Sequence, residues 1–304
     1  MTRLQGGLSI ERMCQLAQVS RAGFYRCFQE QEPQAEEMEL RSSIQKLFLE
    51  HRRRYGYRRI TRALRREGLL ANHKRVQRLM REDNLLAVQP KAFISTTNSQ
   101  HQHEVFLNLA SRIKVTGVNQ LWVADITYIR LQAEFVYLAV ILDAFSRKVV
   151  GWELARMLTC DLTKTALQRA LAARQPARGL IHHSDRGVQY ASQEYTKLLQ
   201  QHEIVSSMSR PANPYDNASC ESFMKTLKQE EIYANEYRDL EQLQQHLEEF
   251  IDDYYNRVRL HSALAYLSPE EFESAAANTM PAATMTFFEP QTDSRTDAAI
   301  NPSP

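Results

Sequence analysis

Residues 121–129 read LWVADITYI, a β-branched and aromatic stretch with one carboxylate, Asp125, where a strand normally carries a hydrophobic side chain. Two more strand-like stretches follow at 134–145 and 147–155, and helical spacing of apolar residues begins at 162. Beyond these, the sequence predicts strands at 179–184 and 204–207 and helices at 192–201, 217–230 and 240–256. Strands that first meander and then alternate with helices predict an α/β fold with a mixed five-stranded sheet.

The basic residues of the chain are concentrated ahead of this region. The 304 residues carry 38 Lys and Arg against 36 Asp and Glu, a net charge of +2, yet residues 41–91 hold 15 basic and 4 acidic side chains, a net of +11. A solvated helical face would mix the two signs, so this segment favours a module that binds the phosphates of DNA. The predicted contacts are Arg52, Arg53, Arg54, Arg58, Arg59, Arg62, Arg65, Arg66, Lys74, Arg75 and Arg78.

Composition excludes several other classes of protein. No apolar run approaches the ~20 residues that a membrane-spanning helix needs. The four cysteines form no CxxC pair, which argues against a zinc knuckle or a disulfide framework and predicts a cytoplasmic protein.

The order of these features predicts five parts. They are a short helix-turn-helix-like segment at 1–32, a basic helical DNA-binding module at 37–90, a linker at 91–118, an α/β core with C-terminal helices at 119–276, and a disordered tail at 277–304.

Three carboxylates stand out within the predicted core. Asp125 lies inside the first strand, Asp185 ends the fourth, and Glu221 begins a helix. Asn217 and Lys228 share a helix face with Glu221, because they lie four residues before it and seven after it. Oxygen ligands of this kind suit Mg²⁺ or Mn²⁺ better than zinc.

Each of these residues also has a purely structural explanation. Asp125 could be an edge residue, Asp185 a turn residue, and Glu221 a first-turn glutamate favoured by the helix dipole. Lys228 could be a solvated lysine, and Asn217 a helix cap. The joint occurrence of the three carboxylates, in this order on this pattern of elements, favours a catalytic site.

Other polar residues in the core are expected to be structural. His182 and His183 are predicted to pack or to form local hydrogen bonds rather than to bind metal, and Asp143 is expected to serve a turn. The same holds for Asp216 in its turn, for the packing of Tyr190 and Tyr215, and for Trp122 and Trp152 in the core.

Longer motifs surround the carboxylates. They read NQLWVADITYI at 119–129, DAFSRKVVGW at 143–152, HSDRGVQY at 183–190 and YNRVRLHSAL at 255–264, and 35 residues separate Asp185 from Glu221. Over residues 40–275 the chain resembles the second-frame transposases of the insertion-sequence-three family, whose core is similar to that of retroviral integrases.

The resemblance implies a ribonuclease-H-like core in which Asp125, Asp185 and Glu221 are the catalytic, metal-binding carboxylates. Lys228 is then expected to contact a DNA phosphate near the scissile bond, and Asn217 to orient the start of its helix or a phosphate. It implies a transposase that binds inverted-repeat ends, cleaves a DNA strand and joins the freed 3′ hydroxyl to a second phosphodiester, with two Mg²⁺ or Mn²⁺ ions per active site. Expected partners are double-stranded DNA, further copies of the chain in a synaptic complex, and the upstream-frame protein or a fusion to it, within the bacterial nucleoid. The alternatives are a catalytically silent DNA-binding regulator, a domesticated remnant, or a nuclease that cuts without joining.

Overall fold

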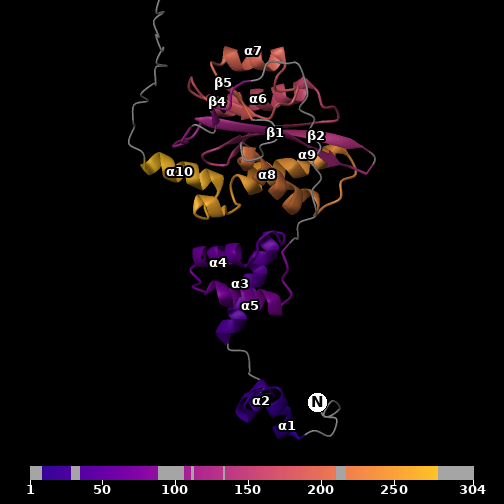
Figure 1. Cartoon of the computed structure of the whole chain (residues 1–304), viewed down its shortest axis with the longest axis vertical. Helices are drawn as coiled ribbons and strands as arrows, with labels where there is room; N and C mark the ends of the chain where they lie inside the picture. The colour runs from indigo at the N-terminus through magenta and orange to yellow at the C-terminus, as the bar shows by residue number, and fades with distance from the viewer. Residues whose placement is uncertain are drawn as a thin grey trace, which may run out of the picture. The chain divides into compact units, whose positions relative to one another are not determined.

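A computed structural model describes residues 9–28, 35–87, 106–110, 113–132, 134–209 and 217–279. The chain divides into two compact units, residues 1–89 and 90–304 (Figure 1). The residues expected to form the tail lie outside the described part from 280 onward, as do Tyr215 and Asp216. Within the described ranges, no helix is both long enough and apolar enough to cross a membrane.

The first unit is all-helical. Its helices are α1 (Ile10–Leu16), α2 (Arg21–Phe28), α3 (Ala35–Glu50), α4 (Tyr57–Arg66) and α5 (His73–Glu82). Polar side chains begin two of them: the hydroxyl of Ser20 accepts a hydrogen bond from the amide of Gly23, and Oδ1 of Asn72 accepts one from the amide of Lys74. Fully buried apolar side chains form the core of α3 to α5, namely Ile44, Ile60, Leu64, Val76 and Leu79.

The second unit is built on the predicted five-stranded sheet. Its strands are β1 (Leu121–Arg130), β2 (Phe135–Asp143), β3 (Val149–Ala155), β4 (Ile181–Ser184) and β5 (Val205–Met208), in the order β3-β2-β1-β4-β5. The β1–β2 and β2–β3 pairs are antiparallel, whereas the β1–β4 and β4–β5 pairs are parallel. This confirms the mixed, ribonuclease-H-like sheet with helices.

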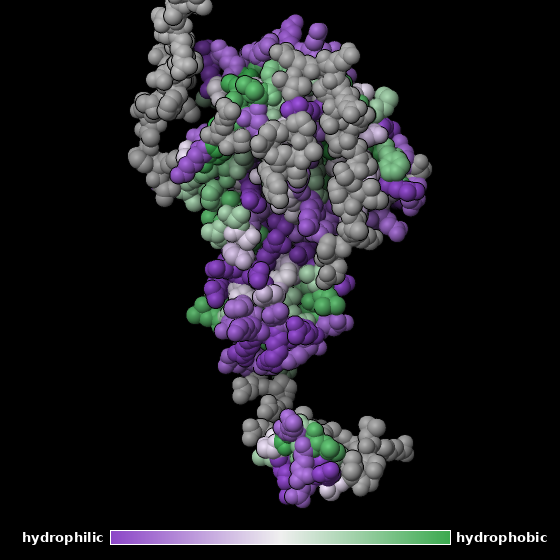
Figure 2. Space-filling model, viewed as in Figure 1, coloured by the Kyte–Doolittle hydropathy of each residue, from purple (hydrophilic) through white to green (hydrophobic). Residues whose placement is uncertain are grey.

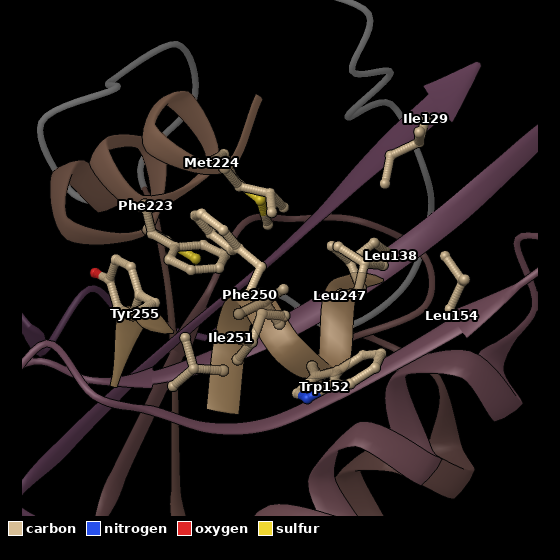
Figure 3. Packing of buried hydrophobic residues seen from close by; sticks show 14 of the residues in the cluster. Ile129, Leu138, Trp152, Leu154, Phe223, Met224, Leu247, Phe250, Ile251 and Tyr255 are labelled. Carbon is tan, nitrogen blue, oxygen red and sulfur yellow. The ribbon is translucent and has the colours of Figure 1, made fainter. Parts of the chain in front are cut away.

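Alternate residues of β1 and β2 face opposite sides of the sheet, and each side has its own core. On one side Trp122, Ala124 and Ile141 pack with α6 (Cys160–Arg174) and α7 (Gln193–Gln201). On the other, Val123 and Val140 pack with α8 (Ala218–Leu227), α9 (Leu240–Glu248) and the helix η5 (Glu249–Tyr255), where Figure 3 shows the aromatic and aliphatic side chains that meet. Trp122 and Trp152 are therefore core residues, as expected.

Two predicted helices change character before they end. The helix expected at 217–230 is α-helical only to Leu227 and continues as a π-helix, η4 (Lys228–Ile232), while the helix expected at 240–256 becomes the π-helix η5. A short 3₁₀ turn, η6 (Ser262–Leu264), and the helix α10 (Pro269–Thr279) complete the unit.

Part of the segment expected to be a linker packs on the second unit. Phe106 packs against the α6 side of the sheet, and Ala110 and Val115 pack against the α8 side. The amide of Leu109 also donates to the hydroxyl of Ser207 on β5 (2.9 Å). These contacts place the described residues of 106–118 with the α/β core.

Candidate active site

The parallel pairing of β1 with β4 brings two of the three carboxylates to neighbouring strands. Trp122 lies opposite His182 and Val123 opposite His183, so the same register continued by two residues sets Asp125 beside Asp185. Asp125 accepts a hydrogen bond from the amide of Ile126 (2.8 Å). Asp185 accepts one from the amide of Gly187 (2.9 Å), which fixes its side chain in the turn after β4.

The electrostatics of Asp125 show that all three carboxylates share one neighbourhood. Burial raises the pKa of Asp125 to about 7, and the negative charge of Asp185, with a smaller contribution from Glu221, adds to this increase. The hydrogen bond from Ile126 and the charge of Lys228 act in the opposite direction. A desolvated carboxylate beside two others of like charge is a strong candidate for a cation ligand or a catalytic group.

Asn217 attaches the helix of Glu221 to the strand of Asp125. Asn217 occupies the N-cap position of α8, but its side chain makes no capping hydrogen bond. Instead its Nδ2 donates to the carbonyl oxygen of Ala124 (3.0 Å), the residue before Asp125. Its Oδ1 is buried and has no hydrogen-bond partner within the described residues. Asn217 therefore positions the start of α8, one turn before Glu221.

Glu221 is the outermost of the three carboxylates. Its side chain is exposed, and partial desolvation raises its pKa. Among the described residues, no group of three His, Cys, Asp or Glu side chains is close enough together to hold a metal ion. The aspartate pair thus forms a preassembled half of the site, and Glu221 is near enough to act on it through its charge but does not close it.

Lys228 lies inside the protein, contrary to the picture of a solvated lysine. It is only 8% exposed, and its Nζ lies 5.2 Å from the centroid of the Tyr128 ring. Burial lowers the pKa of Lys228, and the charge of Asp125 partly offsets this decrease. The ammonium group of Lys228 therefore offsets part of the negative charge of Asp125.

The donor chemistry fits a hard divalent cation. Asp125 and Asp185 offer only carboxylate oxygens, and the pKa of Asp125 is raised first by burial and then by the negative charge of Asp185. The nearby histidines are engaged elsewhere, as expected, since Nε2 of His182 lies 2.9 Å from the hydroxyl of Tyr195 and both ring nitrogens of His183 lie within 3.0 Å of serine hydroxyls.

Asp143 has the structural role that its turn predicted. It is fully buried and accepts hydrogen bonds from three backbone amides, those of Asn119 (2.6 Å), Phe145 (2.9 Å) and Ser146 (3.1 Å). Two of these amides belong to the β2–β3 connection and the third to Asn119, and the guanidinium group of Arg174 lies 3.7 Å away, although burial still raises the pKa of Asp143.

The basic side chains of the first unit fall into two groups. Most of the predicted contacts are exposed, among them Arg58, Arg62 and Arg65, which lie at helical spacing on α4, and Figure 2 shows hydrophilic side chains over much of the visible face of α3 to α5. Arg54, in contrast, is 7% exposed. Arg75 is half-buried and bridges to Glu36 and Glu37 on α3.

Arg78 is likewise paired with acidic side chains, Glu37 and Glu82. The sequence places Glu36 and Glu37 about forty residues before their arginine partners, so local charge counting could not reveal these pairs. The exposed side chains among the predicted contacts include Arg53 and Lys74 and, on α4, Arg58 and Arg65.

Sequence reasoning missed two features of the site. Tyr128 supports Lys228, and it could have been noticed as an aromatic residue three positions after Asp125 on the same strand. Arg186 holds the chain that leaves β5, through a hydrogen bond to the carbonyl oxygen of Ser209 (2.8 Å). Nothing in the sequence signals that second contact.

Comparison with protein families matches both units. Residues 34–93 match the model of an HTH-like domain, and residues 115–214 and 202–269 each match a model of the integrase core domain. The matches cover the helices α3 to α5 and the whole five-stranded sheet with its carboxylates.

Curated relatives match over most of their length. The chain is 40% identical over 241 residues to the transposase for insertion sequence element IS904 of Lactococcus lactis, covering 79% of this chain and 95% of that protein. It is 37% identical over 263 residues to an uncharacterized 31 kDa protein of insertion element IS600 of Shigella sonnei (86% and 97%). It is 36% identical over 275 residues to transposase InsF for insertion sequence IS3A of Escherichia coli (89% and 96%).

Solved structures of viral integrases are similar at lower identity. A simian T-cell lymphotropic virus intasome aligns with a TM-score of 0.45 at 17% identity, over 82% of this chain and 79% of that one. The HTLV-2 integrase catalytic core in complex with magnesium aligns with a TM-score of 0.40 at 18% identity, over 53% and 99%.

Proposed function

We propose, on the premise that this chain belongs to the insertion-sequence transposases of which the IS3 protein InsF is a member, that Asp125, Asp185 and Glu221 form its DNA strand-cleaving and strand-joining site. The observation that carries the proposal is the parallel pairing of β1 with β4, whose register sets Asp125 beside Asp185, while Asn217 ties the helix of Glu221 to Ala124, the residue before Asp125. The pKa of Asp125, which burial and the charge of Asp185 raise to about 7, agrees with this arrangement.

The cofactor we infer is Mg²⁺ or Mn²⁺, two ions per active site, which Asp125, Asp185 and Glu221 would hold. When bound, such ions activate the attacking oxygen and stabilise the leaving oxygen of an in-line displacement at phosphorus. The protein's part is to present Asp125 and Asp185 at a fixed register, and to supply Glu221 from α8 as the third carboxylate.

The reaction consists of two displacements at phosphorus. In the first, a water oxygen bonds to the phosphorus at an end of the element, the bond from phosphorus to the 3′ oxygen breaks, and that oxygen takes up a proton. In the second, this 3′ hydroxyl loses its proton and bonds to another phosphorus, whose bond to its own 3′ oxygen breaks. Because only the nucleophile changes, one site serves both steps without a covalent protein intermediate.

Lys228 and Asn217 support the DNA near the scissile bond. The ammonium group of Lys228, held over Tyr128 and close to Asp125, offsets the charge of an approaching phosphate. Asn217 holds the start of α8 against β1 through its hydrogen bond to the carbonyl oxygen of Ala124.

The first unit binds the ends of the element. Its exposed arginines on α4 and around residues 52–53 provide phosphate contacts to double-stranded DNA, and pairing of two ends requires further copies of the chain in a synaptic complex. The upstream-frame protein, or a fusion to it, is the proposed additional partner. A regulator without catalytic function would need only this unit, and it would not require a buried carboxylate with a raised pKa at position 125.

The decisive experiment separates cutting from joining. Asp125→Asn, Asp185→Asn and Glu221→Gln are each incubated with a duplex inverted-repeat end, labelled at its 3′ strand, and Mg²⁺. We expect each variant to lose cleavage and joining by at least about 10³-fold while it still binds the end, because the basic residues lie in the other unit. Asp253→Asn, an exposed aspartate on η5, is the matched control and should behave as wild type.

Joining at the wild-type rate by any of the three variants would refute the assignment of that carboxylate. A wild-type protein that releases cleaved strands and never joins them would identify a nuclease instead.

A further inference from the structure

Tyr190 carries a buried hydroxyl group that has no hydrogen-bond partner among the described residues. The side chain is only 3% exposed. Its ring packs in the core as expected, edge-on against Tyr195 with 5.4 Å between the ring centroids and 6.2 Å from the ring of His182. Because a buried polar group is normally paired, the hydroxyl of Tyr190 calls for an explanation that packing of the ring does not give.

The backbone ties Tyr190 to the turn that holds Asp185. The amide of Gly187 donates to Oδ1 of Asp185 (2.9 Å), and the carbonyl oxygen of Gly187 accepts from the amide of Tyr190 (3.0 Å). The turn is also closely packed, since a Cβ atom on Gly187 would lie 3.0 Å from the same carboxylate oxygen. Two hydrogen bonds through one glycine thus fix Tyr190 relative to Asp185.

Electrostatics distinguish Tyr190 from the tyrosine that packs against it. Burial raises the pKa of both side chains well above its ordinary value, and at Tyr195 burial is the whole cause. At Tyr190 the charges of Tyr195, Asp185 and Asp125 add to the increase, in that order. The hydroxyl of Tyr195 lies 2.9 Å from Nε2 of His182. Of the two tyrosines, Tyr190 is therefore the one whose unpartnered hydroxyl lies within electrostatic range of the aspartate pair.

We propose that Tyr190 is a positioning residue of the active site: its hydroxyl donates a hydrogen bond to the carboxylate of Asp185 when that carboxylate binds a divalent cation, and so fixes the orientation of this ligand. The inference rests on the proposed function, which makes Asp185 a cation ligand. Carboxylates that bind metal ions are themselves held by hydrogen bonds, and the amide of Gly187 supplies one to Asp185. Tyr190 supplies a second from inside the core, where water does not compete for the donor.

Tyr190→Phe separates this role from simple packing, because it removes one oxygen atom and keeps the ring. If the side chain only packs, the variant binds cations as wild type does. If the hydroxyl holds Asp185, the variant is as stable as wild type without cation but binds cations more weakly. Loss of a residue that orients a metal ligand typically lowers metal affinity by about 10–100-fold.

The test measures Mn²⁺ binding to the full-length protein without DNA, by electron paramagnetic resonance of the free ion. Tyr190→Phe should bind Mn²⁺ about tenfold more weakly than wild type. In EDTA its melting temperature should equal or exceed that of wild type, because the hydroxyl that it lacks has no partner among the described residues. Strand joining by Tyr190→Phe should recover as Mn²⁺ is raised, because the carboxylate ligands themselves are intact.

Tyr195→Phe is the matched control, since it makes the same change in the ring that packs against Tyr190. Its hydroxyl is paired with His182, so this variant should melt at a lower temperature than wild type in EDTA and keep the Mn²⁺ affinity of wild type.

Wild-type Mn²⁺ affinity in folded Tyr190→Phe would overturn the inference, whether or not its melting temperature changes. Failure of the proposed function would look different, since Asp185→Asn would then bind Mn²⁺ and join strands normally.

Discussion

Asp125→Asn should stabilise the metal-free protein at alkaline pH, although it abolishes activity. Burial and Asp185 raise the pKa of Asp125 from 3.8 to about 7, so the folded protein holds a proton there that the unfolded chain has already lost. Between these two pKa values the native state binds more protons than the unfolded state, and stability therefore falls as the pH rises. Asparagine cannot ionise and is free of this loss.

The magnitude follows from the two pKa values. A group that titrates near 7 in the folded state and 3.8 in the unfolded state costs about 4 kcal/mol once fully ionised, of which about 2.5 kcal/mol is lost between about pH 5 and pH 8. For a unit of this size, that corresponds to roughly 5–10 °C in melting temperature. The pH dependence is the informative quantity, because a new amide hydrogen adds a cost that is the same at every pH.

Thermal unfolding of both proteins at about pH 5 and pH 8 provides the assay. The melting temperature of Asp125→Asn relative to wild type should rise by several degrees between the two pH values. Added Mg²⁺ should stabilise wild type and leave the variant unchanged. A difference between variant and wild type that stays the same at both pH values would refute the electrostatic reasoning about Asp125.

Asp143→Asn is the matched comparison, since it makes the same change in a buried carboxylate on the neighbouring strand. Burial raises the pKa of Asp143 too, so the effect of Asp143→Asn should change with pH in the same direction as that of Asp125→Asn. Asp143 also accepts three backbone hydrogen bonds, whereas Asp125 accepts one from Ile126, so an amide nitrogen that faces those three donors should add a loss of about 1–3 kcal/mol at every pH. A loss of stability at about pH 5 in Asp143→Asn but not in Asp125→Asn would distinguish the two carboxylates by their backbone hydrogen bonds.

Two further predictions concern the DNA-binding face and the C-terminal helix. Arg58→Gln or Arg65→Gln should reduce the slope of log affinity for the DNA end against log salt by about 1, because both side chains are exposed on α4. Arg75→Gln, whose arginine bridges to Glu36 and Glu37, should change the slope little, and equal effects in a salt titration would contradict this division. Glu273→Gln should lower the free energy of unfolding in urea by roughly 2–4 kcal/mol, because Glu273 binds Arg174 through two hydrogen bonds (2.8 and 2.5 Å); wild-type stability would argue against that pair as the anchor of α10.

The sheet and its carboxylates could be predicted because their signals are local. β1 is a continuous β-branched run, and the motif around Asp185 ends a short strand, so each element is visible within a few residues. The meeting of Asp125 with Asp185 follows once β4 is paired with β1. The sequence does not show which residue, distant along the chain, each polar side chain contacts in the folded protein.

The basic module shows the same limit. Arg54 is buried although it lies among exposed arginines, and Arg75 is neutralised by glutamates of another helix. The number of basic side chains in a segment can be counted from the sequence, but whether each of them is buried or paired depends on tertiary contacts, such as those between α3 and α5. Arg186 is a similar case, since its contact with Ser209 joins two strands that are adjacent only in the fold.

The π-helix at Lys228 connects these hidden contacts to the site. A π-helix is rare because its wider turn loses packing along its axis, and it often occurs at functional positions. Here the amide of Tyr233 reaches back five residues to the carbonyl oxygen of Lys228 (2.9 Å). The turn brings Glu230 inward to Arg259, with which it forms two hydrogen bonds (2.8 and 2.6 Å).

Glu231, which is also buried, points to its own set of partners. It accepts hydrogen bonds from Asn235 (2.8 Å) and Tyr237 (3.0 Å), and lies 3.1 Å from His246. Two adjacent glutamates can both be buried only if each carboxylate has hydrogen-bond or ion-pair partners. In a regular α-helix the second side chain would point about 100° away from the first around a narrower axis, so it would face a different set of partners. These ion pairs and hydrogen bonds therefore stabilise the π-helical turn of Glu230 and Glu231. That turn begins at Lys228, the residue whose ammonium group lies over the ring of Tyr128.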